Sequence, residues 1–281
     1  MDTKAILIQI AGAAAGDDLI FPTTTEMALR VQRTLDDPDC SLDQLAKLVQ
    51  ADPLLAARVV AVANSVIYNR SGRSITDVKS AVSRIGLNTL RVLAAAVVVR
   101  QMEGMARTGE HRQLAVRLWE HTAHVAALAQ VIARRVTRVN PDTAFFAGII
   151  HEVGGFYLIS RAADYPGLLE GANGSLLAWD EGGAAELGRA VLKRLSAPAE
   201  VSEAVESMWA GYLALPPQSL GDTLLLADQL APVESPLSQL AGSGREGVES
   251  KIDVALDDET LSSILEESAT EVASLIDALR A

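Results

Sequence analysis

The chain has 281 residues, of which 49% are hydrophobic, and it contains one cysteine, Cys40. This composition excludes an intrinsically disordered chain and an intrachain disulfide framework, and the length allows one large domain or two ordinary ones. The net charge of −12 argues against general nucleic-acid binding, because phosphate backbones repel an acidic protein.

Helical periodicity predominates from the first residues, and no run alternates as a strand would, so the sequence predicts an all-α fold. Residues 5–16 fit an amphipathic helix better than a signal peptide, because the leader holds Asp2 and a single Lys4 and because Gln9 interrupts the apolar run. Helix-start signals follow at Pro22 with Glu26, at Ser41 and at Pro53, and Gly86 marks a helix end. The predicted helices of this half are 22–35, 42–50, 53–65, 75–86 and 87–102.

The second half begins after a junction at 104–109. A long helix is expected first, and one continuous helix is expected through 144–160. Residues 233–250, rich in Gly and Ser, predict a linker. The last segment, 257–280, predicts a helix with an apolar stripe that must be covered by the body of the chain or by a second copy. The predicted helices are 111–136, 144–160, 176–195, 197–212, 223–231 and 257–280. The longest apolar run, 92–99, is far short of the roughly 20 residues that a membrane span needs.

Four stretches occur in an order and spacing that resemble one known family. They are "ADPLLAARVV" at 51–60, "AVSRIGLNTLR" at 81–91, "LWEHTAHVAALA" at 118–129 and "AFFAGIIHEVGG" at 144–155. Together they resemble HDOD proteins, which carry the HD-related output domain of bacterial signalling. The resemblance implies an N-terminal helical bundle packed on a degenerate HD-type helical bundle, here with a C-terminal helical extension. We accordingly predict an N-terminal subdomain at 1–106, an HD-like subdomain at 107–232, and a linker with an amphipathic helix at 233–281.

The same resemblance implies a function. It predicts a cytoplasmic, non-catalytic bacterial signal-transduction protein that acts through protein contacts. The partners expected from it are signalling proteins such as receiver or diguanylate-signalling modules. A homodimer formed through 258–280 is an alternative for the last helix. The alternative to this non-catalytic role is an enzyme, a metal-dependent phosphohydrolase or phosphodiesterase that holds one metal ion.

The resemblance also places a candidate metal site. HD enzymes hold metal with one His, an adjacent His-Asp pair and a later Asp, and the matching positions here are His121, His151, Glu152 and Asp228. Imidazole and carboxylate ligands suit a single divalent Mn, Fe or Zn ion. However, Glu152 replaces an Asp, Gly155 stands where active relatives carry Lys, and no histidine follows His151. We therefore expect no two-ion centre and no required cofactor, and we expect these side chains to satisfy one another by hydrogen bonding.

Other polar residues leave alternatives open. His124 lies three residues after His121, so an HxxH metal pair is an alternative to a histidine at the edge of the core. Asn64 and Ser65 predict a helix end that anchors a loop. The three tryptophans, at 119, 179 and 209, are interpreted as packing residues.

The segment 70–138 holds 12 Lys/Arg against 4 Asp/Glu, whereas 216–281 holds 3 against 13. Residues 70–91 of the basic segment contain a helix–Gly–helix pattern that resembles a helix-turn-helix. The second helix is too apolar to lie in a groove of DNA, so nucleic-acid binding is not expected, whereas an anionic ligand such as a cyclic dinucleotide stays an alternative. The basic residues concerned are Arg70, Arg73, Lys79, Arg84 and Arg91.

Overall fold

The computed structural model describes most of the chain. The described residues are 2–16, 30–106, 109–170, 176–195, 197–211, 214, 216–242, 266, 269–270, 272–274 and 276–277. They form helices and connecting turns without a strand, so the predicted all-α class is confirmed for this part of the chain. The helix start predicted at Pro22 and Glu26 lies outside the described residues.

Contacts between Cα atoms divide the chain into two compact units. The larger unit comprises 1–20 and 99–258, and the smaller unit comprises 21–98 and 259–281. The predicted limits differ in one respect, because they assign the first helix to the N-terminal subdomain, whereas that helix contacts α9 of the larger unit. As separate functional segments, 1–106, 107–232 and 233–281 stay a prediction.

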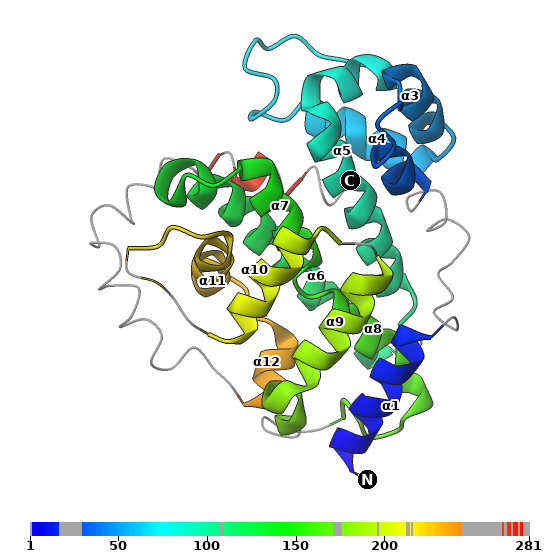
Figure 1. The fold of residues 1–281 in the computed structure, drawn as a ribbon, viewed down its shortest axis with the longest axis vertical. Coiled ribbons are helices and arrows are strands. Elements are labelled where there is room, and N and C mark those ends of the chain that lie inside the picture. The colour runs from blue at the N-terminus through cyan, green and yellow to red at the C-terminus, as the bar shows by residue number, and fades with distance from the viewer. Residues whose placement is uncertain are drawn as a thin grey trace. The chain divides into compact units, whose positions relative to one another are not determined.

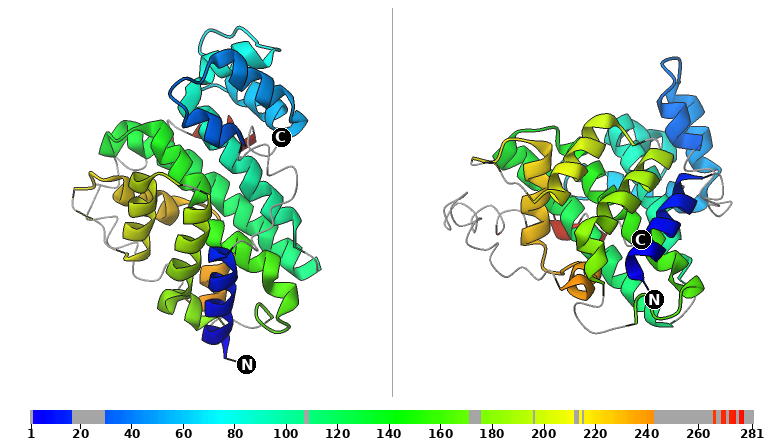
Figure 2. Two further views of the ribbon diagram at one scale, coloured as in Figure 1. Left: turned by 45° about the vertical axis from the view of Figure 1, so that its right-hand side comes forward. Right: turned by 60° about the horizontal axis from the view of Figure 1, so that its bottom comes forward.

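The larger unit is organised around α6, which contacts α7, α8, α11 and α12 (Figure 1). The first helix, α1, runs beside α9, as the two views of Figure 2 also show, and buries the apolar residues Ile6, Leu7 and Ile10. The predicted opening helix is therefore confirmed, although its exposed side also carries an apolar residue, Ile8. The helices of this unit are α1 (Thr3–Ala15), α6 (Gly109–Ile132), α7 (Pro141–Ile150), α8 (Val153–Arg161), α9 (Ala184–Arg194), α10 (Ala199–Trp209), α11 (Leu220–Leu230) and α12 (Pro236–Ala241).

The smaller unit contains helical residues at 30–35 and three further helices, α3 (Leu42–Gln50), α4 (Pro53–Ala63) and the first part of α5 (Val78–Gly104). Ser41 caps α3 through a capping box with Gln44, as its sequence signal predicts. Gly86 interrupts α5 with φ of +80°, a left-handed region that favours glycine, so the predicted helix end at this residue is confirmed.

A loop-anchoring network follows α4 in the smaller unit. The side-chain amide of Asn64 donates to the carbonyl oxygen of Ile75 at 2.7 Å, and its Oδ1 accepts from the Ile75 N–H at 2.8 Å. The Arg84 guanidinium donates to the carbonyl oxygens of Ala63 and Arg73. The prediction that Asn64 anchors this loop is therefore confirmed.

Helices α6 and α7 approach closely at a glycine. A Cβ atom added to Gly148 would lie 2.4 Å from the Cα atom of Ala126, so no larger residue fits there without moving a backbone. Gly154 of α8 meets the backbone of Gly188 on α9 in the same way. Small residues thus set the spacing of the helices that carry the stretch 144–155.

Two described helical segments are long and apolar enough to cross a membrane by length and composition alone. They are 78–104 and 141–164, and most residues of each are buried inside the protein. This burial is what core helices of a folded bundle show.

Two sequence expectations are wrong at the level of helix limits. The helix predicted through 144–160 is broken at His151 and Glu152, where α7 ends and α8 begins. At this break Glu152 has φ of −99° and ψ of 16°, which are not α-helical values. The predicted linker 233–250 also contains a short helix, α12, before the residues that lie outside the described part.

Parts of the last predicted helix are described, and they belong to the smaller unit. Ile276 is buried, and the Ser274 hydroxyl accepts from the backbone N–H of Val66 at 3.2 Å. For these residues the apolar stripe is covered by the same chain. A homodimer through 258–280 stays a prediction, and most of that segment lies outside the described residues.

Candidate metal centre and adjoining cavity

Three of the four predicted site residues come together in the larger unit. His121 lies on α6, His151 follows the last residue of α7, and Asp228 lies on α11. The Nε2 atom of His121 lies 3.3 Å from Nε2 of His151 and 3.2 Å from Oδ1 of Asp228. The three ligand atoms lie within 4.8 Å of one another, and both imidazoles are almost fully buried.

The hydrogen bonds of the two imidazoles fix which nitrogen faces the cluster. Nδ1 of His121 lies 2.8 Å from the carbonyl oxygen of Val233, and Nδ1 of His151 lies 2.7 Å from that of Gly148. A carbonyl oxygen only accepts, so we infer that each Nδ1 carries a hydrogen and donates it. The Nε2 lone pairs of the neutral rings therefore point at each other and at the Asp228 carboxylate.

Three acceptors directed at one point need a cation between them. A backbone carbonyl on the other ring nitrogen is also the usual partner of a metal-binding histidine, because it fixes the tautomer and the ring orientation. The donor set of two imidazoles and one carboxylate suits a divalent transition metal such as Mn, Fe or Zn. These residues therefore fit a single ion.

The charges of the cluster differ between its two histidines. Burial lowers the pKa of His121, but the Asp228 and Glu152 carboxylates outweigh burial, and the net pKa is raised. Burial and the neighbouring His121 lower the pKa of His151 to about 4. The neighbouring carboxylates thus favour the charged form of His121, whereas burial favours the neutral form of His151.

Glu152 lies next to the cluster but bonds elsewhere. Its Oε1 accepts from the Ser235 hydroxyl at 2.8 Å, and it is not one of the three closely grouped ligand residues. Burial raises the pKa of its carboxyl group, and the neighbouring His121 and the Ser235 hydrogen bond only partly offset that rise. Ligation of a metal by Glu152 stays a prediction.

The turn between α11 and α12 supports the site through residues that the sequence did not identify. The Val233 carbonyl oxygen accepts from the His121 ring and Ser235 donates to Glu152, yet both residues lie inside the predicted linker 233–250. A short helix start at Ser235-Pro236 was the available signal, since Pro favours the first turn of a helix.

The other histidine alternative is not supported within the described residues. Nδ1 of His124 faces the carbonyl oxygen of Glu120 at 2.7 Å, and the grouped ligand atoms include His121 but not His124. The HxxH spacing therefore does not produce a second metal-type cluster in this part of the chain.

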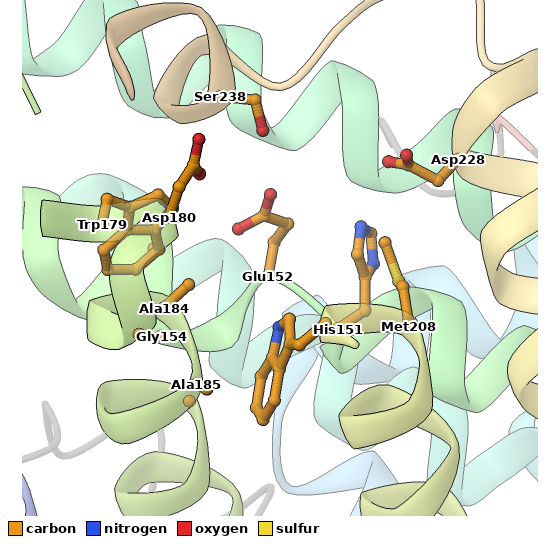
Figure 3. Close-up of a pocket in the computed structure, with 14 residues that line it drawn as sticks. His151, Glu152, Gly154, Trp179, Asp180, Ala184, Ala185, Met208, Asp228 and Ser238 are labelled. Atoms are coloured by element: carbon orange, nitrogen blue, oxygen red, sulfur yellow. The ribbon is translucent and has the colours of Figure 1, made fainter. Parts of the chain in front are cut away.

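A cavity of about 440 Å³ adjoins the cluster. In Figure 3 the carboxyl group of Glu152 projects into the space between Asp180 and Trp179 on one side and Asp228 on the other, with Ser238 beyond it. Trp209 also lines the cavity. The packing interpretation is confirmed for Trp119 and Trp179, which are buried. It did not predict that Trp179 and Trp209 also line the cavity.

In the smaller unit, three of the five basic residues around Gly86 have partners. Lys79 pairs with Asp43 and Arg91 pairs with Asp36, each at 2.6 Å, and Arg84 caps the carbonyl oxygens described above. These charges are engaged within the chain, which weakens the case for an anionic ligand here.

The fold and the cluster together define a class of protein. A helical bundle that directs two imidazoles and a carboxylate from three separate helices at one point is an HD-type domain, and this one lacks the further histidines of a two-ion centre. The sequence matches the HDOD domain family over residues 21–210. The chain belongs to this family, as its motifs predicted.

Solved structures with similar folds carry related descriptions. The structure of a "Putative metal-dependent phosphohydrolase" from Shewanella amazonensis SB2B is 27% identical, with a TM-score of 0.68 over 99% of this chain and 100% of that one. An HDOD domain protein of unknown function from Geobacter sulfurreducens is 23% identical, with a TM-score of 0.63 over 99% of each chain. A "Putative signal transduction protein" from Marinobacter aquaeolei VT8 is 19% identical, with a TM-score of 0.64 over 100% of this chain and 67% of that one.

One curated relative, an uncharacterized protein of Treponema pallidum, is 24% identical over 154 residues. That alignment covers 54% of this chain and 28% of the relative, so the chain spans little more than a quarter of the relative's length.

Proposed function

We propose that this HDOD protein is a cytoplasmic, non-catalytic regulator of bacterial signal transduction, and that its larger unit binds one divalent metal ion. The ion would be held by His121, His151 and Asp228, with Glu152 beside it. The regulatory output would pass through protein contacts, with receiver or diguanylate-signalling modules as the expected partners.

The observation that carries the proposal is the number of converging donors. Three ligand atoms lie within 4.8 Å of one another among the described residues, which is a set for one ion. Two-ion hydrolytic centres hold their metals about 3.5–4 Å apart and need ligands for both. All four histidines of the chain are described, and only two of them face the cluster.

The lining of the cavity supports a role other than phosphate-ester hydrolysis. Its carboxyl groups come from Glu152, Asp180 and Asp228, and the described lining residues include no Lys or Arg. Phosphoryl transfer relies on cationic groups that neutralise the developing negative charge. A phosphate ester in this cavity would face three carboxyl groups and would depend on the single proposed ion for positive charge.

When bound, a divalent ion would supply positive charge to three converging acceptors. The chain's own groups do the rest of the work. Val233 and Gly148 orient the two imidazoles through their carbonyl oxygens, and Ser235 holds Glu152. The result is a link between α6, α7, α11 and the turn before α12, which suits an ion that stabilises one arrangement of the bundle.

A second candidate is a mononuclear metal-dependent phosphohydrolase. It is favoured by the 27% identity to the Shewanella protein described in those terms. The same three ligands would serve it, so the two candidates differ in catalysis and not in metal binding.

The test measures metal content and hydrolysis together. Protein purified without chelator is expected to contain one Mn, Fe or Zn ion per chain by elemental analysis. The His151→Ala variant is expected to bind the ion at least about 100-fold more weakly, since even the loss of a supporting hydrogen bond costs 10–100-fold. Neither protein is expected to hydrolyse bis(p-nitrophenyl) phosphate above the buffer rate.

His124→Ala is the matched control, because it removes a histidine of α6 whose Nδ1 faces Glu120 outside the cluster. It should retain the ion. Two ions per chain, or hydrolysis that disappears in His151→Ala, would favour the second candidate. Absence of a stoichiometric ion would contradict the metal part of the proposal.

A further inference from the structure

The cavity beside the metal cluster has walls of two kinds. Carboxyl groups of Glu152, Asp180 and Asp228 line it, and so do the indole rings of Trp179 and Trp209. The thioether of Met208 adds a soft apolar contact. Its volume of about 440 Å³ lies within the range of small-molecule sites, which is far larger than one metal ion requires.

The charges around the cavity favour a cation. The described lining residues offer three carboxyl groups and no Lys or Arg, and one of the three, that of Asp228, is also a proposed ligand of the metal ion. The Arg189 guanidinium lies over the ring of the wall residue Trp209 and is paired with Glu206 at 3.2 Å. An anionic or neutral ligand would gain little from these walls.

The aromatic walls favour an organic cation over an inorganic one. Indole is the best of the protein rings for attracting an ammonium or guanidinium group to its face. The Trp209 ring already has the Arg189 guanidinium 5.9 Å from its centroid, so a ligand cation would meet the part of the ring that lines the cavity. Methyl or methylene groups next to the charge would pack against the indoles and Met208.

We propose that this cavity binds a small organic cation, an ammonium head carrying methyl or short alkyl groups, between the carboxyl groups and the two indole rings. Asp180 is exposed and would meet the charged head, and Glu152 is less exposed; Figure 3 shows the carboxyl groups of both facing the same space. The inference goes beyond the proposed metal-linked regulation by naming the class of ligand that the cavity would sense. It does not require the metal ion to be bound.

The test compares cations with a neutral molecule of the same shape. Tetramethylammonium, choline and propylammonium are titrated into the full-length protein, with binding followed by calorimetry and by the fluorescence of the tryptophans. At least one cation is expected to bind, and 3,3-dimethylbutan-1-ol, the uncharged isostere of choline, is expected to bind about tenfold more weakly than choline or not at all. Titrations run with and without added metal keep this result separate from the metal-site proposal.

Two neighbouring carboxylates provide the matched variants. Asp180→Asn should weaken cation binding about fivefold, which corresponds to an exposed ion pair of about 1 kcal/mol. Glu181→Gln should leave it unchanged, because Glu181 lines a different cavity with Lys4 and Arg189. Failure of all three cations to bind, equal binding of choline and its neutral isostere, or equal effects of the two variants would overturn the proposal.

Discussion

Two polar networks of this protein, one part-buried and one buried, end in different ways. In the smaller unit, the Asn64 amide places both its donor and its acceptor on the backbone of Ile75, and the network is complete. In the larger unit, the backbone carbonyls engage only one nitrogen of each imidazole, and His121, His151 and Asp228 turn their remaining acceptors toward one point. The first network fixes a loop, whereas the second leaves a place for a cation. Buried polar residues therefore indicate a binding site when their partners leave acceptors facing one another.

The comparison is tested most strongly by adding the metal ion. A free-ion concentration 100 times the dissociation constant should raise the free energy of unfolding of the wild type by about 2.7 kcal/mol, because only the folded protein binds it. Asn64→Ala should show the same increase from a lower starting point, since its network does not touch the ion. His151→Ala should show none. Chemical unfolding with and without the ion measures all three, and an equal response of His151→Ala would break the distinction.

Removing the complete network should cost stability in the absence of metal. Asn64→Ala leaves the N–H and carbonyl oxygen of Ile75 without their side-chain partner, and we expect a loss of about 2 kcal/mol in the free energy of unfolding. Ser71→Ala, a change in the same loop at an exposed residue, is the control and should cost less than about 0.5 kcal/mol. The metal affinity of Asn64→Ala should equal that of the wild type, and a tenfold loss would contradict the comparison.

The smallest expected effect concerns a second complete network, at the start of α11. Burial opposes ionisation of Asp222, but donation from the backbone N–H groups of Ala214, Gln218 and Ser219 outweighs burial and lowers the pKa of its carboxyl group. Asp222→Asn should cost about 1 kcal/mol in the free energy of unfolding at neutral pH.

The sign of the pH dependence follows from that lowered pKa. Because the carboxyl group stays ionised longer in the folded than in the unfolded chain, its contribution is fully present above the ordinary pKa of about 3.9. It is lost as the pH falls from there through the lowered value. The stability difference between wild type and Asp222→Asn should therefore be constant from pH 7 to 5 and shrink below about pH 4. A difference that grew on acidification would refute the assignment.

The sequence predicted the elements whose signals are local. Ser41 predicted the start of α3, and Gly86 predicted the break in α5, because capping and positive φ depend on neighbouring residues. The break between α7 and α8 was not predictable in this way. The residues around His151 and Glu152 are apolar and helical in pattern, and the turn is held by contacts with distant parts of the chain such as Ser235.

The same limit applies to the site. The family motifs identified His121, His151 and Asp228, and the structure brings these three together. The separate role of Glu152 depends on its hydrogen bond with Ser235, 83 residues later. Ser235 precedes a short helix that was not predicted, because the Gly and Ser residues that follow indicated a linker. The cavity walls could not be predicted from the sequence either. A tryptophan at a helical position is consistent with packing until the structure shows an open space beside it.

The absence of a side chain at Gly148 has a consequence for the chelating geometry. Direct contact between its backbone and Ala126 sets the distance between α6 and α7. The same glycine supplies the carbonyl oxygen that orients the His151 ring. One residue thereby sets both the span between the imidazoles and the tilt of one of them. Ion selectivity in this bundle would then be tuned by the size of a residue that never touches the ion.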